Sequence, residues 1–191
     1  MLNDGTLKLT VGPAPKPGND LVGVRIKSKV KHSTGQWCGD LLPFNSPDLK
    51  EGPVFAFYVA DKNPIDREHE EWDEIDFEFM SRYQNAVWTN RFHGISGADH
   101  QNTTVAFNVP LNFKQQTQFS TYCINWKADG TAIGTIDGVV MRNYTIPKPW
   151  KELYLYLSIW GSDEAAFWSG SIRSMTKSYS CYAKNIVYSL Q

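Results

Sequence analysis

Three carboxylic acids stand at alternate positions in one short stretch of the sequence. Glu74, Asp76 and Glu78 are separated by single apolar residues within Trp72–Met80. Side chains two positions apart on an extended strand point to the same face, so the three acids share one face. Neighbouring carboxylates of this kind can work as general acid, general base or nucleophile, because burial and mutual repulsion move their pKa values apart.

The spacing of the two glutamates fits a particular reaction class. Four strand steps of about 3.3 Å place the Cα atoms of Glu74 and Glu78 about 13 Å apart, and side chains that lean together bring the carboxyls much closer. Glycosidases that retain anomeric configuration hold two carboxyls about 5–5.5 Å apart, and inverting enzymes about 6.5–9.5 Å. The spacing permits a retaining pair. Asp76, between them, can hydrogen-bond to one glutamate and hold it.

Two other interpretations of the acidic face stay open. Like charges in a row are unfavourable, and Asp and Glu are poor strand formers, so folding stability alone does not explain the pattern. The face could be simply solvated, or its carboxylates could bind Ca²⁺ or Mn²⁺ through oxygen. In the catalytic interpretation Trp72, on the same face, stacks on a sugar ring.

The elements that must position these acids are strands. Helical periodicity is almost absent, and short β-branched and aromatic runs alternate with Gly, Pro, Asn and Asp, which predicts a sandwich or barrel. The turn signals Asp129-Gly130 and Asp137-Gly138 predict a meander. The predicted strands are Leu7–Val11, Val22–Lys31, Val54–Ala60, Glu74–Met80, Ala86–His93, Thr103–Asn108, Phe119–Lys127, Thr131–Asp137, Val139–Tyr144, Glu152–Trp160 and Lys184–Leu190.

The strand Glu152–Trp160 has two chemically different faces. One carries only aliphatic residues and belongs against a second sheet. The other carries Tyr154, Tyr156, Ser158 and Trp160, and faces solvent or a ligand, or lies beneath a loop. We expect one domain over residues 1–191, without repeats or linkers.

Composition limits the partners. The formal net charge is -1 and 14% of the residues are aromatic, including seven Trp. The small charge gives no broad field for nucleic acid or an anionic membrane, no apolar run reaches transmembrane length, and half-exposed aromatic rings suit sugars. We expect a monomer that binds a polysaccharide or oligosaccharide, with no nucleic acid and no membrane as partner.

The three cysteines, Cys38, Cys123 and Cys181, lack metal-type spacing. One pair could form a disulfide and leave an odd thiol, or all three could be buried and free. We expect a secreted protein. Because the amino terminus lacks a signal-peptide core, this expectation implies a mature or trimmed chain.

The acidic segment closely resembles the catalytic signature of glycoside hydrolase family 16, which is E-x-D-x-E with apolar residues between the acids. The preceding Trp-Asp is most similar to bacterial licheninases (endo-β-1,3-1,4-glucanases), and the related xyloglucan endotransglycosylases share DEIDFEF. Looser matches to the family lie at Asn3–Gly5, Leu7–Leu9, Val24–Ser28, Gly52–Tyr58, Thr89-Asn90, Phe119–Tyr122, Trp126, Ile136–Gly138, Ile159-Trp160 and Trp168.

The resemblance implies an all-β jelly-roll of two antiparallel sheets with a concave substrate cleft. It implies an endo-acting, retaining β-glucanase on β-1,3-1,4- or β-1,4-linked glucan, with Glu74 as nucleophile, Glu78 as general acid/base and Asp76 as assisting carboxylate. No cofactor or catalytic metal is expected, although similar proteins often hold a structural Ca²⁺ on the convex face. The residues that the resemblance places at sugar subsites are Trp72, Tyr58, Asn90, Arg25, Trp160 and Trp168.

This sequence also departs from the licheninase pattern. It begins near the family's early strand, so the amino-terminal segment is shortened. Gly23 stands where licheninases have an acid, Ser158 where they have Asn, and Asp40–Glu51 resembles an added loop. Trp168 follows an Ala-Ala-Phe stretch instead of the usual acidic pair. These differences leave the glucan undetermined. The catalytic assignment is unaffected by them. A transglycosylase, a non-catalytic glucan-binding domain and a structural or cell-adhesion sandwich stay as alternatives.

Overall fold

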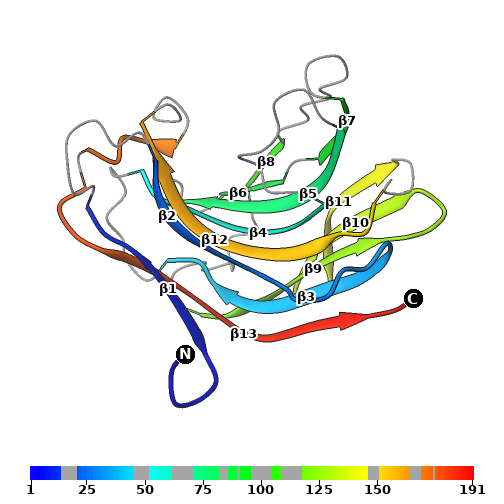
Figure 1. Ribbon diagram of the computed structural model, residues 1–191, viewed down its shortest axis with the longest axis horizontal. Helices are drawn as coiled ribbons and strands as arrows, with labels where there is room; N and C mark the ends of the chain where they lie inside the picture. The colour runs from blue at the N-terminus through cyan, green and yellow to red at the C-terminus, as the bar shows by residue number, and fades with distance from the viewer. Residues whose placement is uncertain are drawn as a thin grey trace.

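Alternating apolar residues build two antiparallel sheets that stack face to face (Figure 1). The predicted sandwich of two antiparallel sheets is confirmed. The computed structural model describes residues 1–13, 21–44, 52–61, 71–81, 86–89, 91–95, 105–108, 118–145, 151–163, 169–173 and 175–191. Nothing in this part of the chain is a helix long and apolar enough to cross a membrane.

The six-stranded sheet has the order β1-β13-β3-β9-β10-β11. Its strands are β1 (Leu7–Val11), β13 (Tyr179–Ser189), β3 (Gly35–Leu42), β9 (Ser120–Trp126), β10 (Thr131–Ile136) and β11 (Val139–Thr145). The predicted meander is confirmed, because β9, β10 and β11 are successive antiparallel neighbours.

The seven-stranded sheet has the order β2-β12-β4-β5-β6-β8, and β7 pairs with β5. Its strands are β2 (Leu21–Lys27), β12 (Tyr154–Ser162), β4 (Val54–Ala60), β5 (Glu71–Met80), β6 (Ala86–Thr89), β7 (Arg91–Ile95) and β8 (Val105–Asn108). The sheet curves so that its outer face, turned away from the six-stranded sheet, lies on the inside of the curve (Figure 1). We call this outer face the concave face.

Three expectations about the strands need correction. The segment Asp40–Glu51 is not wholly an added loop, because its first three residues belong to β3, a strand that was not predicted. Trp37 and Leu41 of this strand point into the core, and Asp40 on its other face accepts hydrogen bonds from Thr121 and Asn185. The predicted strand Ala86–His93 is two strands, and β13 begins five residues before the predicted Lys184.

The core fills the space between the sheets with aromatic rings. Phe77 and Phe79 of β5 meet Tyr122 of β9 edge-on, with ring centroids 5.6 and 5.0 Å apart. Burial raises the pKa of the Tyr122 hydroxyl well above its usual range. Trp126 is fully buried, as expected for a core residue. These contacts fix β5, which carries the three acids, directly against the second sheet.

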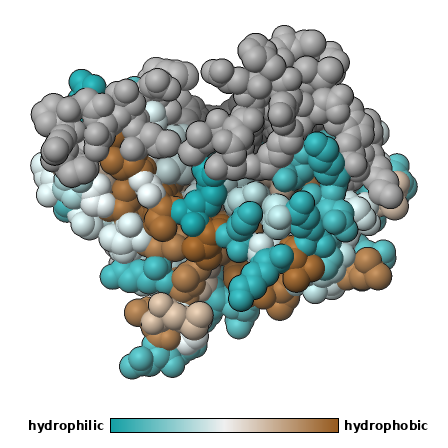
Figure 2. Space-filling view, in the orientation of Figure 1, coloured by the Kyte–Doolittle hydropathy of each residue, from teal (hydrophilic) through white to brown (hydrophobic). Residues whose placement is uncertain are grey.

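One side of the sandwich is less completely covered. Apolar surface is exposed in the view of Figure 2. The edge strand β2 exposes Val24 and Ile26 to 39% and 37%, and β13 exposes Ile186 and Val187 to 39% and 55%. Beyond Ala183 the register with β1 ends, so this half of β13 lacks that neighbour.

A disulfide closes the six-stranded sheet across neighbouring strands. Cys38 and Cys123 are direct register partners on β3 and β9 and form the bond, while Cys181 is a buried free thiol. The alternative with one disulfide and one free thiol is therefore confirmed. Burial raises the pKa of the Cys181 thiol, which keeps it protonated and unreactive in the folded chain.

We predict that thiol titration separates these cysteines. The unreduced protein should show one thiol only after unfolding, and three after reduction and unfolding, because Cys38 and Cys123 are bonded and Cys181 is buried. Reduction should lower the free energy of unfolding by about 2–4 kcal/mol, since the bond constrains the unfolded chain. Cys181→Ala, whose disulfide is intact, is the control for urea unfolding with and without reductant. An unreduced, unfolded chain with three reactive thiols would contradict the pairing.

Candidate active site

Strand β5 separates two chemistries onto its two faces. Ile75, Phe77 and Phe79 are at most 1% exposed and belong to the core between the sheets. The acids alternate with them, so they lie on the concave face. Glu74 and Asp76 are buried and Glu78 is half-buried.

Strand β4 places a small residue opposite each glutamate. Glu74 lies opposite Ala60 and Glu78 lies opposite Ala56, whereas Asp76 lies opposite Tyr58. Each glutamate therefore has a short alanine side chain as its neighbour on β4, and both alanines are buried. Ala56, Tyr58 and Ala60 form a second apolar cluster with Tyr156, separate from the core. The two glutamates therefore lie beside small residues of β4, and Asp76 between them lies beside the aromatic ring of Tyr58.

The aromatic floor continues onto β12. The rings of Tyr58 and Tyr156 stack with centroids 4.8 Å apart and planes within 7° of parallel. Burial raises the pKa of the Tyr156 hydroxyl, the Arg25 cation opposes this shift, and the charges of Asp61 and Glu74 add to it. Tyr156 is the register partner of Tyr58, which in turn pairs with Asp76, so the tyrosine lies on the same face as the acids.

Hydrogen bonds between two aspartates hold the backbone at the start of the acidic segment. The Asp73 amide donates to Asp61 Oδ1 at 3.2 Å, and the Asp61 amide donates to the Asp73 carbonyl at 3.2 Å. This reciprocal pair joins the end of β4 to β5 immediately before Glu74. It fixes the backbone at the position of the first glutamate.

A further hydrogen bond crosses between the two sheets. The hydroxyls of Thr89 on β6 and Tyr144 on β11 lie 2.9 Å apart. Burial raises the pKa of Tyr144 to about 12, and the charge of Asp76 contributes. Strand β6, the neighbour of β5, is thus tied to β11 of the opposite sheet.

The predicted subsite residues fall into two groups. Arg25, Tyr58 and Trp160 lie on strands β2, β4 and β12, at positions that alternate onto the concave face. Tyr58 is only 4% exposed, and its ring is covered in part by the stacked ring of Tyr156. The Trp72 side chain and all of Asn90 and Trp168 lie outside the described residues. Sugar contacts by all six stay predictions.

Sequence reasoning named neither Asp61 nor Tyr156 as a site residue. Asp61 carries no sequence signal of its own, since its role comes from the pairing of β4 with β5. Tyr156 could have been found, because the alternation of β12 already put it on the polar and aromatic face. Gly23, which replaces an acid of the licheninase pattern, lies opposite Trp160, where a Cβ would come within 2.8 Å of the Trp160 Cβ.

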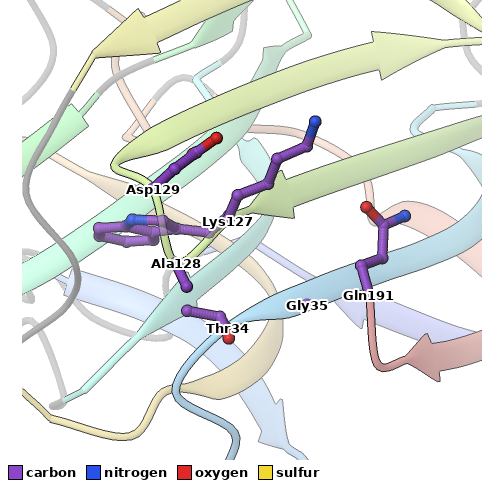
Figure 3. A pocket seen from close by; sticks show the side chains of 7 residues that line it. Thr34, Gly35, Lys127, Ala128, Asp129 and Gln191 are labelled. Carbon is purple, nitrogen blue, oxygen red and sulfur yellow. The ribbon is translucent and has the colours of Figure 1, made fainter.

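A metal site and a surface cavity are the other candidate sites in the described part of the chain. Within the described residues, no group of three or more His, Cys, Asp or Glu side chains is arranged to hold a metal ion. A cavity of about 320 Å³ lies at the turn between β9 and β10, where Lys127, Asp129 and the terminal Gln191 border it (Figure 3). This cavity belongs to the six-stranded sheet and contains none of the predicted site residues.

The fold and the paired acids define a carbohydrate-active β-sandwich of the glycosidase class. The sequence pattern of the glycosyl hydrolases family 16 matches residues 4–180, and the chain belongs to this family. The expected jelly-roll is confirmed by a solved β-1,3-1,4-glucanase (lichenase) from a mouse hindgut metagenome, which superposes with a TM-score of 0.73 at 22% identity over 98% of this chain and 81% of that chain.

Curated relatives come from two branches of the family. A β-glucanase of Paenibacillus polymyxa is 24% identical over 94% of this chain and 69% of its own length. A probable xyloglucan endotransglucosylase/hydrolase of Arabidopsis thaliana is 27% identical over 88% of this chain, which spans only 54% of that relative. The family is therefore shared by glucanases and transglycosylases.

We predict that the two faces of β5 respond differently to mutation. Phe77→Ala should lower the free energy of unfolding by about 3–5 kcal/mol, because it opens a cavity in the core. Glu78→Gln should leave this free energy unchanged or raise it, because it relieves repulsion among the carboxylates. Urea unfolding measures both. A larger loss for Glu78→Gln than for Phe77→Ala would contradict the assignment of the faces.

Proposed function

We propose that this chain is an endo-acting, retaining β-glucan hydrolase that cleaves β-1,3-1,4- or β-1,4-linked glucan. The observation that carries the proposal is the acid triad of β5 on the concave face of a family 16 fold, beside the alanine floor of β4. The lichenase structure and the bacterial β-glucanase relative support a glucan as substrate.

The proposed mechanism uses the two glutamates in turn. The Glu74 carboxylate attacks the anomeric carbon and forms a glycosyl-enzyme ester, while Glu78 donates its proton to the departing glycosidic oxygen. Glu78 then takes a proton from water, whose oxygen attacks the anomeric carbon and releases Glu74. Asp76 assists by holding a neighbouring glutamate. Because the carboxylates supply nucleophile, acid and base, no catalytic metal enters the proposal.

A secreted location is also part of the proposal. The disulfide between Cys38 and Cys123 supports it, because such bonds persist in oxidising compartments. A polymeric substrate outside the cell agrees with the same location. A structural Ca²⁺ on the convex face stays an expectation from the family resemblance.

We predict that either glutamate is indispensable for cleavage. Glu74→Gln and Glu78→Gln should each lower kcat on the preferred glucan by at least about a hundredfold, since each removes a reacting group. Reducing-sugar release from lichenan, laminarin, xyloglucan and chitin oligomers measures this. The exposed Glu152 lies outside β5, and Glu152→Gln serves as the matched control with unchanged kcat.

The same assay distinguishes a binding domain. A wild-type chain that binds glucan but releases no sugar would replace the hydrolase by a non-catalytic domain. Full activity of Glu74→Gln would remove the proposed nucleophile.

The second candidate is a transglycosylase, favoured by the similarity to the plant endotransglucosylase/hydrolase. In that reaction a sugar hydroxyl, not water, attacks the glycosyl-enzyme ester. For the hydrolase we predict that a labelled oligosaccharide acceptor at high concentration stays unextended in the presence of xyloglucan or lichenan. Chromatography of the labelled products measures this. Labelled products longer than the acceptor would instead establish transfer.

A further inference from the structure

Two lysines converge on one tyrosine at the β2 side of the concave face. Lys27 Nζ lies 4.3 Å and Lys31 Nζ 4.7 Å from the centroid of the Tyr154 ring. Tyr154 is half-buried and packs edge-on against Tyr156, with centroids 6.0 Å apart. The two ammonium groups therefore stand at the end of the aromatic floor formed by Tyr58 and Tyr156.

A bulge in the backbone brings the second lysine to the ring. The Ser28 amide donates to the Leu155 carbonyl at 2.8 Å, and the His32 amide donates to the Leu153 carbonyl at 3.0 Å. Three residues, 29–31, thus lie opposite the single residue Tyr154. Ser28 Oγ fixes the bulge by donating to the Val30 carbonyl and accepting from the Leu155 amide. The convergence of Lys27 and Lys31 is built into the backbone.

In the described ranges, neither Lys27 nor Lys31 has a carboxylate as ion-pair partner. Cations gathered on one ring repel each other, and an oxyanion bound between them would remove that repulsion.

The lysine pair lies in the same row as the proposed nucleophile. Tyr154 is the register partner of Ala60, and Ala60 is the register partner of Glu74. With neighbouring strands about 4.8 Å apart, the Cα atoms of Tyr154 and Glu74 are about 10 Å apart. A glycan that lies across the strands over Glu74 therefore reaches the lysine pair within a short oligosaccharide.

We propose that Lys27, Lys31 and Tyr154 form a subsite for an acidic group of the glycan, a carboxylate or a sulfate ester on a sugar ring. The ammonium groups bind the oxyanion, and the Tyr154 ring holds them in place. This inference rests on the proposed function, because the glycan must occupy the concave face. It adds that the preferred chain carries negative charge, which an unmodified glucan lacks.

The test compares polymers of one backbone that differ only in charge. The probes are unmodified, carboxymethylated and sulfated β-glucan of equal length, in affinity electrophoresis with Glu74→Gln as the uncleaving background. We expect tighter binding of a modified polymer. Lys27→Gln with Lys31→Gln should weaken that binding by about tenfold and leave binding of the unmodified polymer unchanged. Added salt of about 0.5 M should erase the difference.

A matched control lies on the other sheet. Lys8 Nζ stands 5.9 Å from the Tyr182 ring centroid on β1 and β13, so Lys8→Gln removes a similar lysine away from the concave face and should change nothing. The two modified polymers show whether carboxylate or sulfate is preferred. Equal binding of charged and uncharged polymers, an equal loss in Lys8→Gln, or no binding at all would overturn the subsite.

Failure of the subsite is distinguishable from failure of the proposed hydrolase. If the unaltered chain cleaves neutral glucan without any preference for charge, the hydrolase stands and the subsite falls. If charged polymer is preferred through Lys27 and Lys31 but no polymer is cleaved, the subsite stands and the hydrolysis falls.

Discussion

The structure depends on the two-sided burial of β5. Its inward rings, led by Phe77 and Phe79, hold the seven-stranded sheet against Tyr122 of the six-stranded sheet. The same contacts fix the direction of the acids on the other face, because successive side chains of a strand cannot turn independently. Carboxylates that repel one another would otherwise spread apart. The free energy of core packing offsets that repulsion and keeps the acids together.

The neighbouring strands turn this constraint into a site. The reciprocal bonds between Asp61 and Asp73 fix the backbone at the start of the acidic segment, and β4 places a small alanine opposite each glutamate. Tyr156 continues this face from β4 onto β12 through its stack on Tyr58. The acids, the floor and the lysine-bearing edge therefore lie on consecutive neighbours in one sheet.

Period-two patterns made much of this predictable. The alternation in β5 and β12 specified which residues face the core, and the turn signals specified the meander. Strand β3 was not predicted because Cys38, Gly39 and Asp40 separate its core residues Trp37 and Leu41. Cys38 and Asp40 are held in the sheet by bonds to residues of β9, which the local sequence does not reveal. The pairing of Cys38 with Cys123 could not be chosen from sequence, since it depends on the register of β3 with β9.

Net charge describes the whole chain and does not show where charged side chains gather. The whole chain has a formal charge of -1, which favours a neutral partner. Lys27 and Lys31 nevertheless lie against the Tyr154 ring, because of a backbone bulge that no sequence pattern predicts. The local arrangement of charges, not their sum, decides what the concave face attracts.

All seven residues of β4 are buried, on both sides of the sheet. A strand enclosed in this way tolerates only exchanges that conserve volume, because neither face can expel a larger side chain into water. The centre of the site is therefore slow to change in evolution. New preferences among polysaccharides would have to arise at its margin, where the exposed side chains of β2 accept substitution without disturbing the packing underneath.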